Sequence, residues 1–343
     1  MPSARIRYFS GTGNTRRAVD AMAAAMAAGG WSVELLAIEG GGGAARGPVD
    51  LELLAFPTLA WGPPAFVRRH VRSLPRAAGA SAAVFATWGG DAMGGVERAA
   101  RELERRGYEV VATGGALYPS NWRQMEDGPS AAESSALVER GDAAARAFAD
   151  ALVSGAEPRL PRPRASASWT AVVQPLFRLF GRRVLGKLFV ADVKCTGCGL
   201  CARTCPAGAI AMRDSGGKPR PRWSFSCENC NRCINFCPAR AIQSSGFRTA
   251  YHGITLAALT AASFAGAGAA AGAAAGGGGF ARAAAWLAGF AVCTAAALWL
   301  QFGPLDALAF RIEGARNGAL RETGYSKSFR RYLAEGFDPA KER

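Results

Sequence analysis

The sequence contains few of the residues that usually carry acid–base or nucleophilic chemistry. Two of its 343 residues are histidine and five are lysine. Neither histidine has a partner at ligand spacing, and no Ser/His/Asp or paired-carboxylate arrangement is present. We therefore assign no catalytic residue. His70 is expected on a solvated helix face among arginines, and His252 at a membrane interface, because it precedes a long apolar segment.

Acidic residues are scarce in the second half of the chain. Residues 1–156 hold 16 basic and 16 acidic side chains, so residues 157–343, with 25 basic and 10 acidic, carry the whole net charge of +15. These basic residues cluster beside apolar segments, and no recognised nucleic-acid-binding fold accompanies them. The asymmetry therefore predicts membrane lipid, rather than nucleic acid, as a partner.

An apolar signal-peptide core is missing after Met1, and eight of the nine cysteines lie between Cys195 and Cys237. A secreted disulfide framework would require such a leader. We therefore expect the chain to start in the cytosol.

The first 156 residues alternate between strand-like and helix-like segments. The expected strands are Arg5–Phe9, Trp31–Ile38, Leu51–Pro57, Ser81–Thr87 and Tyr108–Thr113, and the expected helices are Thr15–Ala28, Val67–Leu74, Val96–Arg106 and Ser134–Val153. A glycine run, Gly40–Gly43, separates the second and third strands. This alternation predicts a doubly wound α/β domain with a five-stranded parallel sheet in the order 2-1-3-4-5.

A loop rich in hydroxyl groups, Ser10-Gly11-Thr12-Gly13-Asn14-Thr15, lies between the first strand and the first helix. Its hydroxyls and the backbone N–H groups of a helix N-terminus would hold a terminal phosphate. The loop lacks the lysine of a Walker motif and the G-x-G-x-x-G spacing of dinucleotide-binding loops. Hydroxyls without a cation favour a monophosphate such as that of FMN. The alternative is an ordinary turn that caps a helix.

The loops after the third and fourth expected strands should lie at the same edge of the sheet as the hydroxyl-rich loop. Doubly wound folds bind ligands there, beyond the carboxyl ends of their strands. Exposed tryptophans are costly unless they stack on a ligand, so Trp61 and Trp88 are expected to bracket an isoalloxazine ring. The segment Tyr118–Trp122 would line the same rim. The predicted FMN-binding residues are Ser10, Thr12, Gly13, Asn14, Thr15, Pro57, Thr58, Trp61, Gly62, Thr87, Trp88, Gly89 and Gly90.

Two cysteine motifs of identical spacing are the most specific signal in the chain. Each reads C-x2-C-x2-C-x3-C-P, from Cys195 to Pro206 and from Cys227 to Pro238. This spacing wraps three thiolates around one [4Fe–4S] cluster and sends the fourth to the other cluster. Cluster 1 is therefore assigned Cys195, Cys198, Cys201 and Cys237, and cluster 2 Cys227, Cys230, Cys233 and Cys205. A pair of zinc sites is the alternative, but zinc gives no reason for eight cysteines in this repeat without a nearby histidine.

A basic linker, residues 157–190, separates the two regions. Prolines alternate with arginines from Pro158 to Arg164, which is typical of a stiff spacer. Trp169–Val190 then mixes apolar and basic residues in a helical pattern. Such a helix could lie in a membrane interface or pack its apolar side on a neighbouring domain, and the pattern fits both.

Two long segments without charge follow the cysteines. No charged residue occurs between Arg248 and Arg282 or between Arg282 and Asp306. As helices, Ile254–Ala275 and Ala283–Phe302 would each be about 30 Å long, enough to cross a bilayer. Gly268, Gly272 and Gly276 recur at the spacing of closely packed membrane helices. We predict a transmembrane hairpin over residues 254–302; a soluble alanine-rich hairpin is the alternative.

Basic residues flank this hairpin on its outer sides. Arg240 and Arg248 precede it, and Arg311, Arg316 and Arg321 follow it, whereas the turn holds only Arg282. The positive-inside rule then places both ends, including the basic tail of residues 303–343, at the cytoplasmic face of the cell membrane.

The motifs resemble known families. Residues 4–154 resemble flavodoxins, whose phosphate-loop pattern Ser10–Thr15 matches, and residues 190–245 resemble bacterial two-cluster ferredoxins. This order is similar to that of the bacterial flavodoxin–ferredoxin fusion family. The resemblance implies a flavodoxin-like domain at 1–156 and a small α+β two-cluster ferredoxin domain at 191–247 that carries single electrons at low potential.

Taken together, these patterns predict a membrane-anchored electron-transfer protein with FMN and two [4Fe–4S] clusters, working with an unidentified redox partner protein. One alternative is an oxidoreductase that reduces membrane quinone or a lipid-soluble substrate at the flavin. The other is an iron–sulfur redox sensor.

Overall fold

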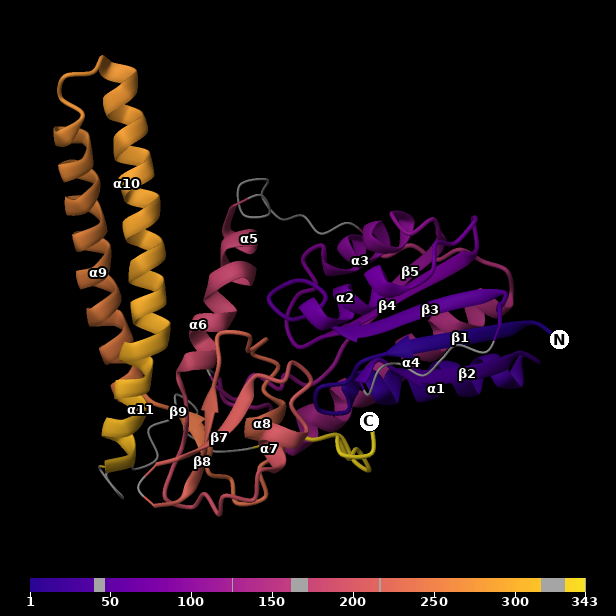
Figure 1. The fold of residues 1–343 in the computed structure, drawn as a ribbon. Coiled ribbons are helices and arrows are strands. Elements are labelled where there is room, and N and C mark those ends of the chain that lie inside the picture. The colour runs from indigo at the N-terminus through magenta and orange to yellow at the C-terminus, as the bar shows by residue number, and fades with distance from the viewer. Residues whose placement is uncertain (40–46, 125, 162–171, 216, 316–330, 343) are drawn as a thin grey trace.

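The computed structural model describes the chain apart from residues 40–46, 125, 162–171, 216, 316–330 and 343 (Figure 1). The glycine run 40–43, the second half of the Pro/Arg linker, Trp169, Arg316 and Arg321 therefore lie outside the described residues.

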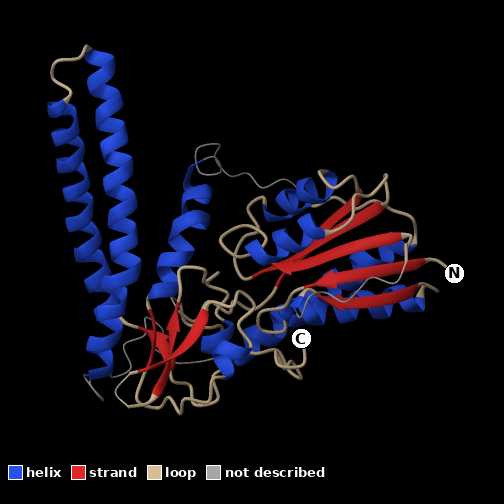
Figure 2. Cartoon of the chain, in the orientation of Figure 1, coloured by secondary structure: helices blue, strands red, loops and turns tan. Residues whose placement is uncertain are grey.

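The N-terminal domain is a five-stranded parallel sheet between two layers of helices (Figure 2). Its strands are β1 (Ser3–Tyr8), β2 (Ser32–Ala37), β3 (Leu51–Pro57), β4 (Ser81–Trp88) and β5 (Glu109–Leu117). They lie in the order β2-β1-β3-β4-β5, which confirms the predicted topology. Strands covered on both faces read as near-continuous apolar runs, as in β3 and β4.

Each face of the sheet has its own core. Helices α1 (Asn14–Ala28) and α4 (Ala131–Val153) cover one face, where Met22 and Phe148 belong to the same buried cluster as Ile6 of β1. Helices α2 (Ala65–Ser73) and α3 (Gly95–Glu104) cover the other, where Val67 and Val96 are fully buried. This layering leaves the carboxyl ends of the strands open on one edge.

The cysteine motifs lie in a small domain built from two short antiparallel pairs. Strand β6 (Phe189–Ala191) pairs with β9 (Ile242–Ser244), and β7 (Ile210–Asp214) pairs with β8 (Pro219–Trp223). The short helices α7 (Leu200–Arg203) and α8 (Arg232–Phe236) each begin inside one cysteine motif. The core joins Phe189, Trp223 and Ile234 to the thiols.

The apolar–basic segment before this domain is helical only as far as Lys187. It consists of α5 (Gln174–Leu176), the π-helical turn η3 (Phe177–Gly181) and α6 (Arg182–Lys187). The predicted helix to Val190 is wrong at its end, because Phe189–Ala191 pairs with β9 as a strand.

This segment combines features of both interpretations of its sequence. Gln174, Arg182 and Lys187 are buried against the rest of the protein. Its other side exposes apolar side chains, namely Val172, Val173, Leu176, Leu179 and Phe180.

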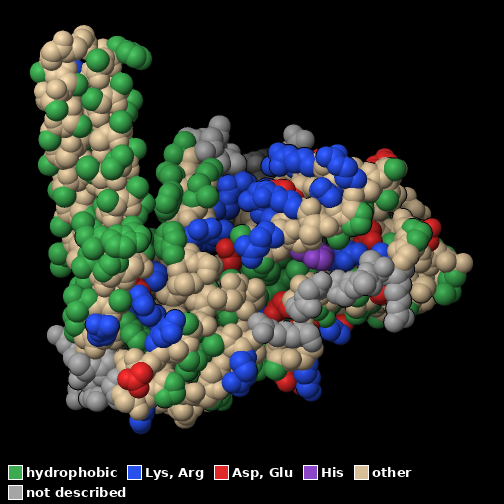
Figure 3. All heavy atoms as spheres, in the orientation of Figure 1, with side chains coloured by type: hydrophobic (Ala, Val, Ile, Leu, Met, Phe, Trp, Pro, Cys, Tyr) green, Lys and Arg blue, Asp and Glu red, His purple; other side chains and the backbone are tan. Residues whose placement is uncertain are grey.

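Two long antiparallel helices project from the small domain (Figure 1). They are α9 (Gly246–Ala273) and α10 (Gly279–Leu300), and α10 continues through the π-helical turn η4 (Gln301–Leu305) into α11 (Asp306–Ala315). Both are long and apolar enough to cross a membrane, and almost none of their apolar stretches is buried. Figure 3 shows their surface as mainly hydrophobic and uncharged, with basic side chains gathered beside the lower part of the hairpin.

The predicted glycine stripe does not form the contact between these helices. Side chains added at Gly268, Gly272 or Gly276 would meet open space. The close approach is instead at Gly266, where a Cβ would lie 2.6 Å from the Cys293 sulfur, and at Gly289. Gly266 and Gly268 are two residues apart, or about 200° around an α-helix, so the repeat lies on the side of α9 away from α10, and Gly276 lies beyond the end of α9.

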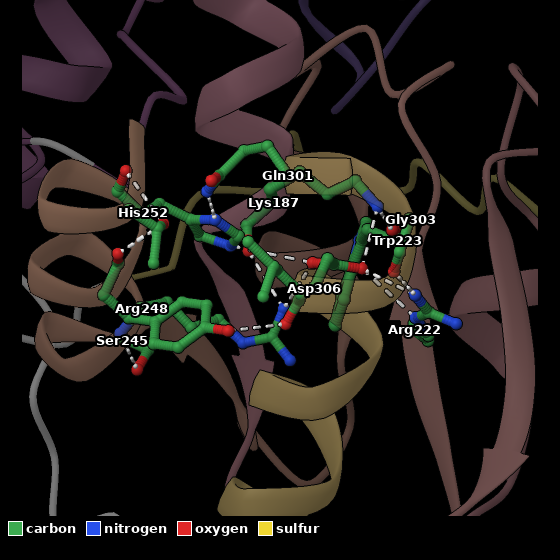
Figure 4. A network of polar contacts seen from close by, with 12 residues as sticks. Lys187, Arg222, Trp223, Ser245, Arg248, His252, Gln301, Gly303 and Asp306 are labelled. Carbon is green, nitrogen blue, oxygen red and sulfur yellow. Dashed lines mark hydrogen bonds and ion pairs between the residues drawn. The ribbon is translucent and has the colours of Figure 1, made fainter. Parts of the chain in front are cut away.

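A buried ionic network joins the hairpin to the small domain (Figure 4). Asp306, at the start of α11, accepts hydrogen bonds from Lys187 Nζ at 3.0 Å and Arg222 Nη2 at 2.9 Å. Arg248 of α9 pairs with both Asp306 and Glu313. Removing one member would leave a buried charge without its partner, which is strongly destabilising.

His252 belongs to the same network. It is 4% exposed, and its Nδ1 lies 2.6 Å from the Gln301 side-chain nitrogen. Gln301 and Phe302 of η4 and Asp306 of α11 contact this histidine, and its expected position at a membrane interface stays a prediction.

Candidate functional site

A cavity of about 310 Å³ lies at the carboxyl ends of β1, β3, β4 and β5, between the two domains. We call it the interdomain cavity. Gly13 and Gly62 are not in its wall, although they flank residues that are. The sequence-predicted residues that do line it are Ser10, Thr12, Asn14, Thr15, Pro57, Thr58, Trp61, Thr87, Trp88, Gly89 and Gly90.

The loop of residues 10–15 forms one end of the cavity. The side chains of Ser10, Thr12 and Thr15 are buried, and Thr15 Oγ1 lies 2.7 Å from Thr87 Oγ1. Gly13 adopts φ 103° just before α1 begins, and its N–H donates to Ser10 Oγ at 3.1 Å. A tight hydroxyl-lined turn at a helix N-terminus has the donor chemistry to hold a phosphate.

Arg232, from the second cysteine motif, orients this loop from behind. Its guanidinium donates to the carbonyl oxygens of Ser10 and Gly11, and to that of Thr204 at 2.9 Å. A trans peptide points its N–H opposite to its carbonyl, so the N–H groups of Gly11 and Thr12 face away from Arg232. Glu39 neutralises the arginine, which is 1% exposed.

Residues 331–342 fold back onto the same loop. The Ala334 N–H donates to the Thr12 carbonyl at 2.8 Å, and a Cβ at Gly13 would lie 2.4 Å from that of Ala334. The Tyr332 hydroxyl bonds the Asn14 side chain. This explains why Gly13 is not in the cavity wall: it faces the C-terminal segment.

The loop after β3 is held in an unusual backbone conformation. Ala60 and Trp61 have φ of 51° and 58°, and Leu59 and Gly62 exchange backbone hydrogen bonds across them. Left-handed backbone in two successive non-glycine residues is costly, and such strain collects at binding sites. The turn places the Trp61 ring 5.3 Å from that of Phe177 in η3.

Trp88 approaches the cavity from the end of β4. A Cβ at Gly115 would lie 2.2 Å from the Trp88 ring, so only glycine on β5 allows the indole to lie there. A Cβ at Gly89 would likewise lie too close to Ser120, so this position also requires glycine. Both tryptophans line the cavity, and the bracketing of a ring by the pair stays a prediction.

The second cysteine motif supplies the opposite wall. Glu228, Asn229 and Asn231 line the cavity. Asn229 Oδ1 accepts from the Trp122 indole N–H at 2.9 Å, and Asn231 Oδ1 from the Gln124 N–H at 3.1 Å.

Sequence reasoning missed these contacts and Arg232. The residues between the cysteines could have indicated them, because the two motifs differ there. The second motif has Glu-Asn, Asn-Arg and Ile-Asn-Phe between its cysteines, and the first has Thr-Gly, Gly-Leu and Ala-Arg-Thr.

A buried ion pair lies in the same wall. Arg182 of α6 and Glu228 are 2.6 Å apart, and Glu228 also accepts from the Ala65 N–H at the start of α2. Burial lowers the pKa of the Arg182 guanidinium, and Glu228 opposes that shift. Among the described residues that line the cavity, Arg182 is the only cation.

The thiols gather in two sets. Cys195, Cys198, Cys201 and Cys237 line one small recess, together with Cys233, and Cys205, Cys227, Cys230 and Cys233 line another, together with Cys201. Burial and the neighbouring thiols of Cys237 and Cys195 raise the pKa of Cys201 to about 12. Burial and Cys205 do the same for Cys230, again to about 12. Such crowded thiols release their protons when iron binds them, so the donor chemistry fits an iron–sulfur group.

Comparison with known proteins identifies the small domain. Residues 194–242 match the family described as the 4Fe-4S dicluster domain. A search of curated proteins found no match.

The solved structures similar to this chain include several flavodoxins. A short-chain flavodoxin associated with a non-canonical PDU bacterial microcompartment is 16% identical, with 46% of this chain and 99% of that chain covered and a TM-score of 0.32. A Streptococcus pneumonia TIGR4 flavodoxin is 18% identical, with 45% and 99% covered and a TM-score of 0.32. Flavodoxin 2 from Bacillus cereus is 23% identical, with 43% and 98% covered and a TM-score of 0.31.

The strand order and the domain match together define the architecture. The chain joins a flavodoxin-like domain to a 4Fe-4S domain and adds two long apolar helices. Such a combination is suited to electron transfer.

Proposed function

We propose that this chain is an electron-transfer protein that holds FMN in the interdomain cavity and two [4Fe–4S] clusters on its two thiol sets. One observation carries the proposal: the hydroxyl loop of residues 10–15 and the residues between Cys227 and Cys233 line the same cavity. A flavin held there would lie against the second cysteine motif. FMN supplies one- and two-electron chemistry and each cluster single-electron transfer.

The residues of the chain position and tune these groups. Ser10, Thr12 and Thr15, with the backbone N–H groups of their loop, would hold the phosphate, and Trp61 and Trp88 the ring. The buried ion pair of Arg182 and Glu228 also lines the cavity, and the pair adds no net charge there.

The hairpin supports membrane anchoring. Its apolar helices lack a covering layer of protein, whereas the core helix of a soluble protein would be mostly buried. We propose that α9 and α10 cross the membrane and that the flavin and iron–sulfur domains lie at its cytoplasmic face, where the basic flanks favour anionic lipid.

Metal and flavin analysis of the detergent-solubilised protein, purified without oxygen, tests the proposal. We expect one FMN and about eight irons with about eight labile sulfides per chain. Zinc in place of iron, or a chain that takes up no FMN on reconstitution, would contradict it.

Reduction of quinone or another lipid-soluble substrate at the flavin is a second candidate. The observation that favours it is the segment α5–η3, which exposes Leu176, Leu179 and Phe180 while its Phe177 lines the cavity. An apolar molecule leaving the bilayer would meet this surface first. Steady-state quinone reduction by the purified protein, with a soluble electron donor, would distinguish this activity from simple electron transfer between two protein partners.

A further inference from the structure

The two thiol sets differ in their access to other proteins. In the described part of the chain, Cys198 is the one exposed cysteine and Cys227 the one buried cysteine. A Cβ at Gly186 of α6 would lie 2.8 Å from the Cys227 sulfur, and one at Gly11 would lie 3.6 Å from the Cys230 carbonyl oxygen. The second set is therefore enclosed between α6 and the hydroxyl loop, whereas the first opens to the surroundings at Cys198.

The exposed thiol lies in the recess that the first thiol set lines. Leu200, Met212 and Phe236 line it together with the cysteines of the first set. Val193, just before that motif, is 50% exposed. Leu200, Met212 and Phe236 are partly exposed, so with Val193 they form an apolar rim around the group that the first thiol set would hold, and such a rim beside a redox group is suited to contact with a protein partner.

Basic side chains form the edge of this recess. Lys194 precedes Cys195 in the chain, Arg203 donates to the Cys198 carbonyl at 2.8 Å, and the Arg240 N–H donates to the Cys237 carbonyl at 3.0 Å. Lys218 adjoins Pro219, which packs on Gly197 inside the motif. All four side chains are exposed.

Asp214, opposite Pro219 in the β7–β8 pair, adds one exposed negative charge. Four positive charges and one negative leave the edge at 4 − 1 = +3. The elements that carry it, α7, β7 and β8, lie at the end of the small domain away from the tip of the hairpin (Figure 1). A protein could therefore approach while the hairpin is in a bilayer.

We propose that this recess and its basic edge form the docking surface for an acidic electron-carrier protein, which exchanges electrons with cluster 1. The inference rests on the proposed function. In each exchange one electron passes between the docked carrier and the group held by Cys195, Cys198, Cys201 and Cys237. One partner is oxidised and the other reduced by that single electron, and no bond or proton is transferred. Cluster 2 then connects this surface to the interdomain cavity.

Binding of a redox-inert acidic carrier to the full-length holoprotein in detergent tests the docking surface. The probe is an acidic plant-type ferredoxin whose iron is replaced by gallium, so the readout is affinity and needs no electron transfer. Lys218→Glu with Arg240→Glu reverses two charges of the edge. Arg76→Glu with Arg101→Glu makes the same change in net charge on exposed residues of the flavodoxin-like domain.

We expect the first pair of substitutions to weaken carrier binding about tenfold or more, and the second to change it less than about twofold. Raising the salt from about 20 mM to about 500 mM should weaken binding to the unchanged protein and remove the difference between the variants. Basic cytochrome c should not compete.

Iron, sulfide and FMN are measured in every variant. A protein without clusters would overturn the proposed function itself, whereas intact clusters with equal carrier binding in both variants would overturn only the docking surface. Loss of binding to anionic-lipid vesicles in Lys218→Glu/Arg240→Glu, with carrier binding unchanged, would reassign the surface to lipid. If charge reversal lowers cluster content, Lys218→Gln with Arg240→Gln gives the same test at half the charge change.

Discussion

The two cysteine motifs have the same spacing but different surroundings. At corresponding positions the first has Gly197 and Gly199, with φ of 72° and 69°, and the second has Asn229 and Asn231, with φ of 54° and 56°. Asparagine tolerates this left-handed backbone better than most residues and adds a side chain that forms hydrogen bonds. In the second motif those side chains contact the flavodoxin-like domain, whereas in the first the glycines have none, and Pro219 of the same small domain packs on Gly197.

The cysteines and the residues between them therefore encode separate properties of a motif. The cysteines specify what group is bound, and the spacers specify what lies next to it. Substitutions at matched positions of the two motifs can therefore separate chemistry from placement.

Loss of one thiolate from each motif should have the largest effect. Cys198→Ala and Cys230→Ala are each expected to lower iron from about eight to about four per chain. Only Cys230→Ala should also lower FMN content, because its neighbours Asn229 and Asn231 line the cavity. Iron and flavin assays on the purified variants measure both effects, and equal flavin loss in the two would contradict the different placement of the motifs.

Arg232→Leu gives the second motif the residue that the first has at this position, Leu200. We expect the free energy of unfolding to fall by about 3–5 kcal/mol, because the substitution breaks the buried ion pair of Arg232 with Glu39. Guanidinium unfolding with FMN fluorescence as the probe measures this change. Leu200→Met is the matched control, with an expected loss below about 1.5 kcal/mol. A similar small loss for Arg232→Leu would mean that the arginine does not join the domains.

Asn229→Gly with Asn231→Gly removes the interdomain side chains but keeps residues that suit a positive φ. The clusters should stay intact, whereas the contact between the two domains should weaken by about 3 kcal/mol, roughly 1 kcal/mol for each of the three hydrogen bonds lost to Trp122 and Gln124. Hydrogen exchange over residues 119–124 should accelerate accordingly. Gly199→Asn is the reciprocal control and should leave exchange there unchanged. Loss of iron from the double variant would show that the asparagines support the cluster rather than the interface.

Thr12→Ala with Thr15→Ala tests the other side of the interface. We expect FMN to bind about tenfold more weakly, or about 1.4 kcal/mol, with iron content unchanged. Flavin titration of the apoprotein measures the affinity. Ser73→Ala with Ser154→Ala removes two exposed hydroxyls that bond only to nearby helix carbonyls, and it should have no effect. Unchanged affinity in the threonine variant would count against the phosphate site.

Much of the fold could be predicted from local patterns. Strands β3 and β4 are apolar runs between glycine- and proline-containing loops, and helices follow them at regular intervals. Because the carboxyl ends of parallel strands meet at one edge, the sequence alone predicts that Thr15, Trp61 and Trp88 lie at one cavity. The assignment of FMN and of each cysteine to its cluster stays a prediction.

Contacts between distant segments could not be predicted in the same way. Arg232 reaches Gly11 across 221 residues, and nothing in either local pattern specifies the other. The prediction that the glycine repeat of α9 contacts the other helix was wrong for a different reason. Residues two positions apart lie about 200° apart around an α-helix, so Gly266, which faces α10, and Gly268, where the repeat begins, lie on opposite sides of α9.

The segment 331–342 has a consequence for how the protein is made. The Tyr8 hydroxyl donates to Glu342 across 334 residues at 2.7 Å, and the Thr12 carbonyl accepts from Ala334. The support behind the hydroxyl loop is thus translated only after both hairpin helices have been synthesised. An N-terminal domain emerging from the ribosome has its sheet but lacks this backing. Tight binding of the proposed flavin would then come late in biogenesis, after both apolar helices have been synthesised.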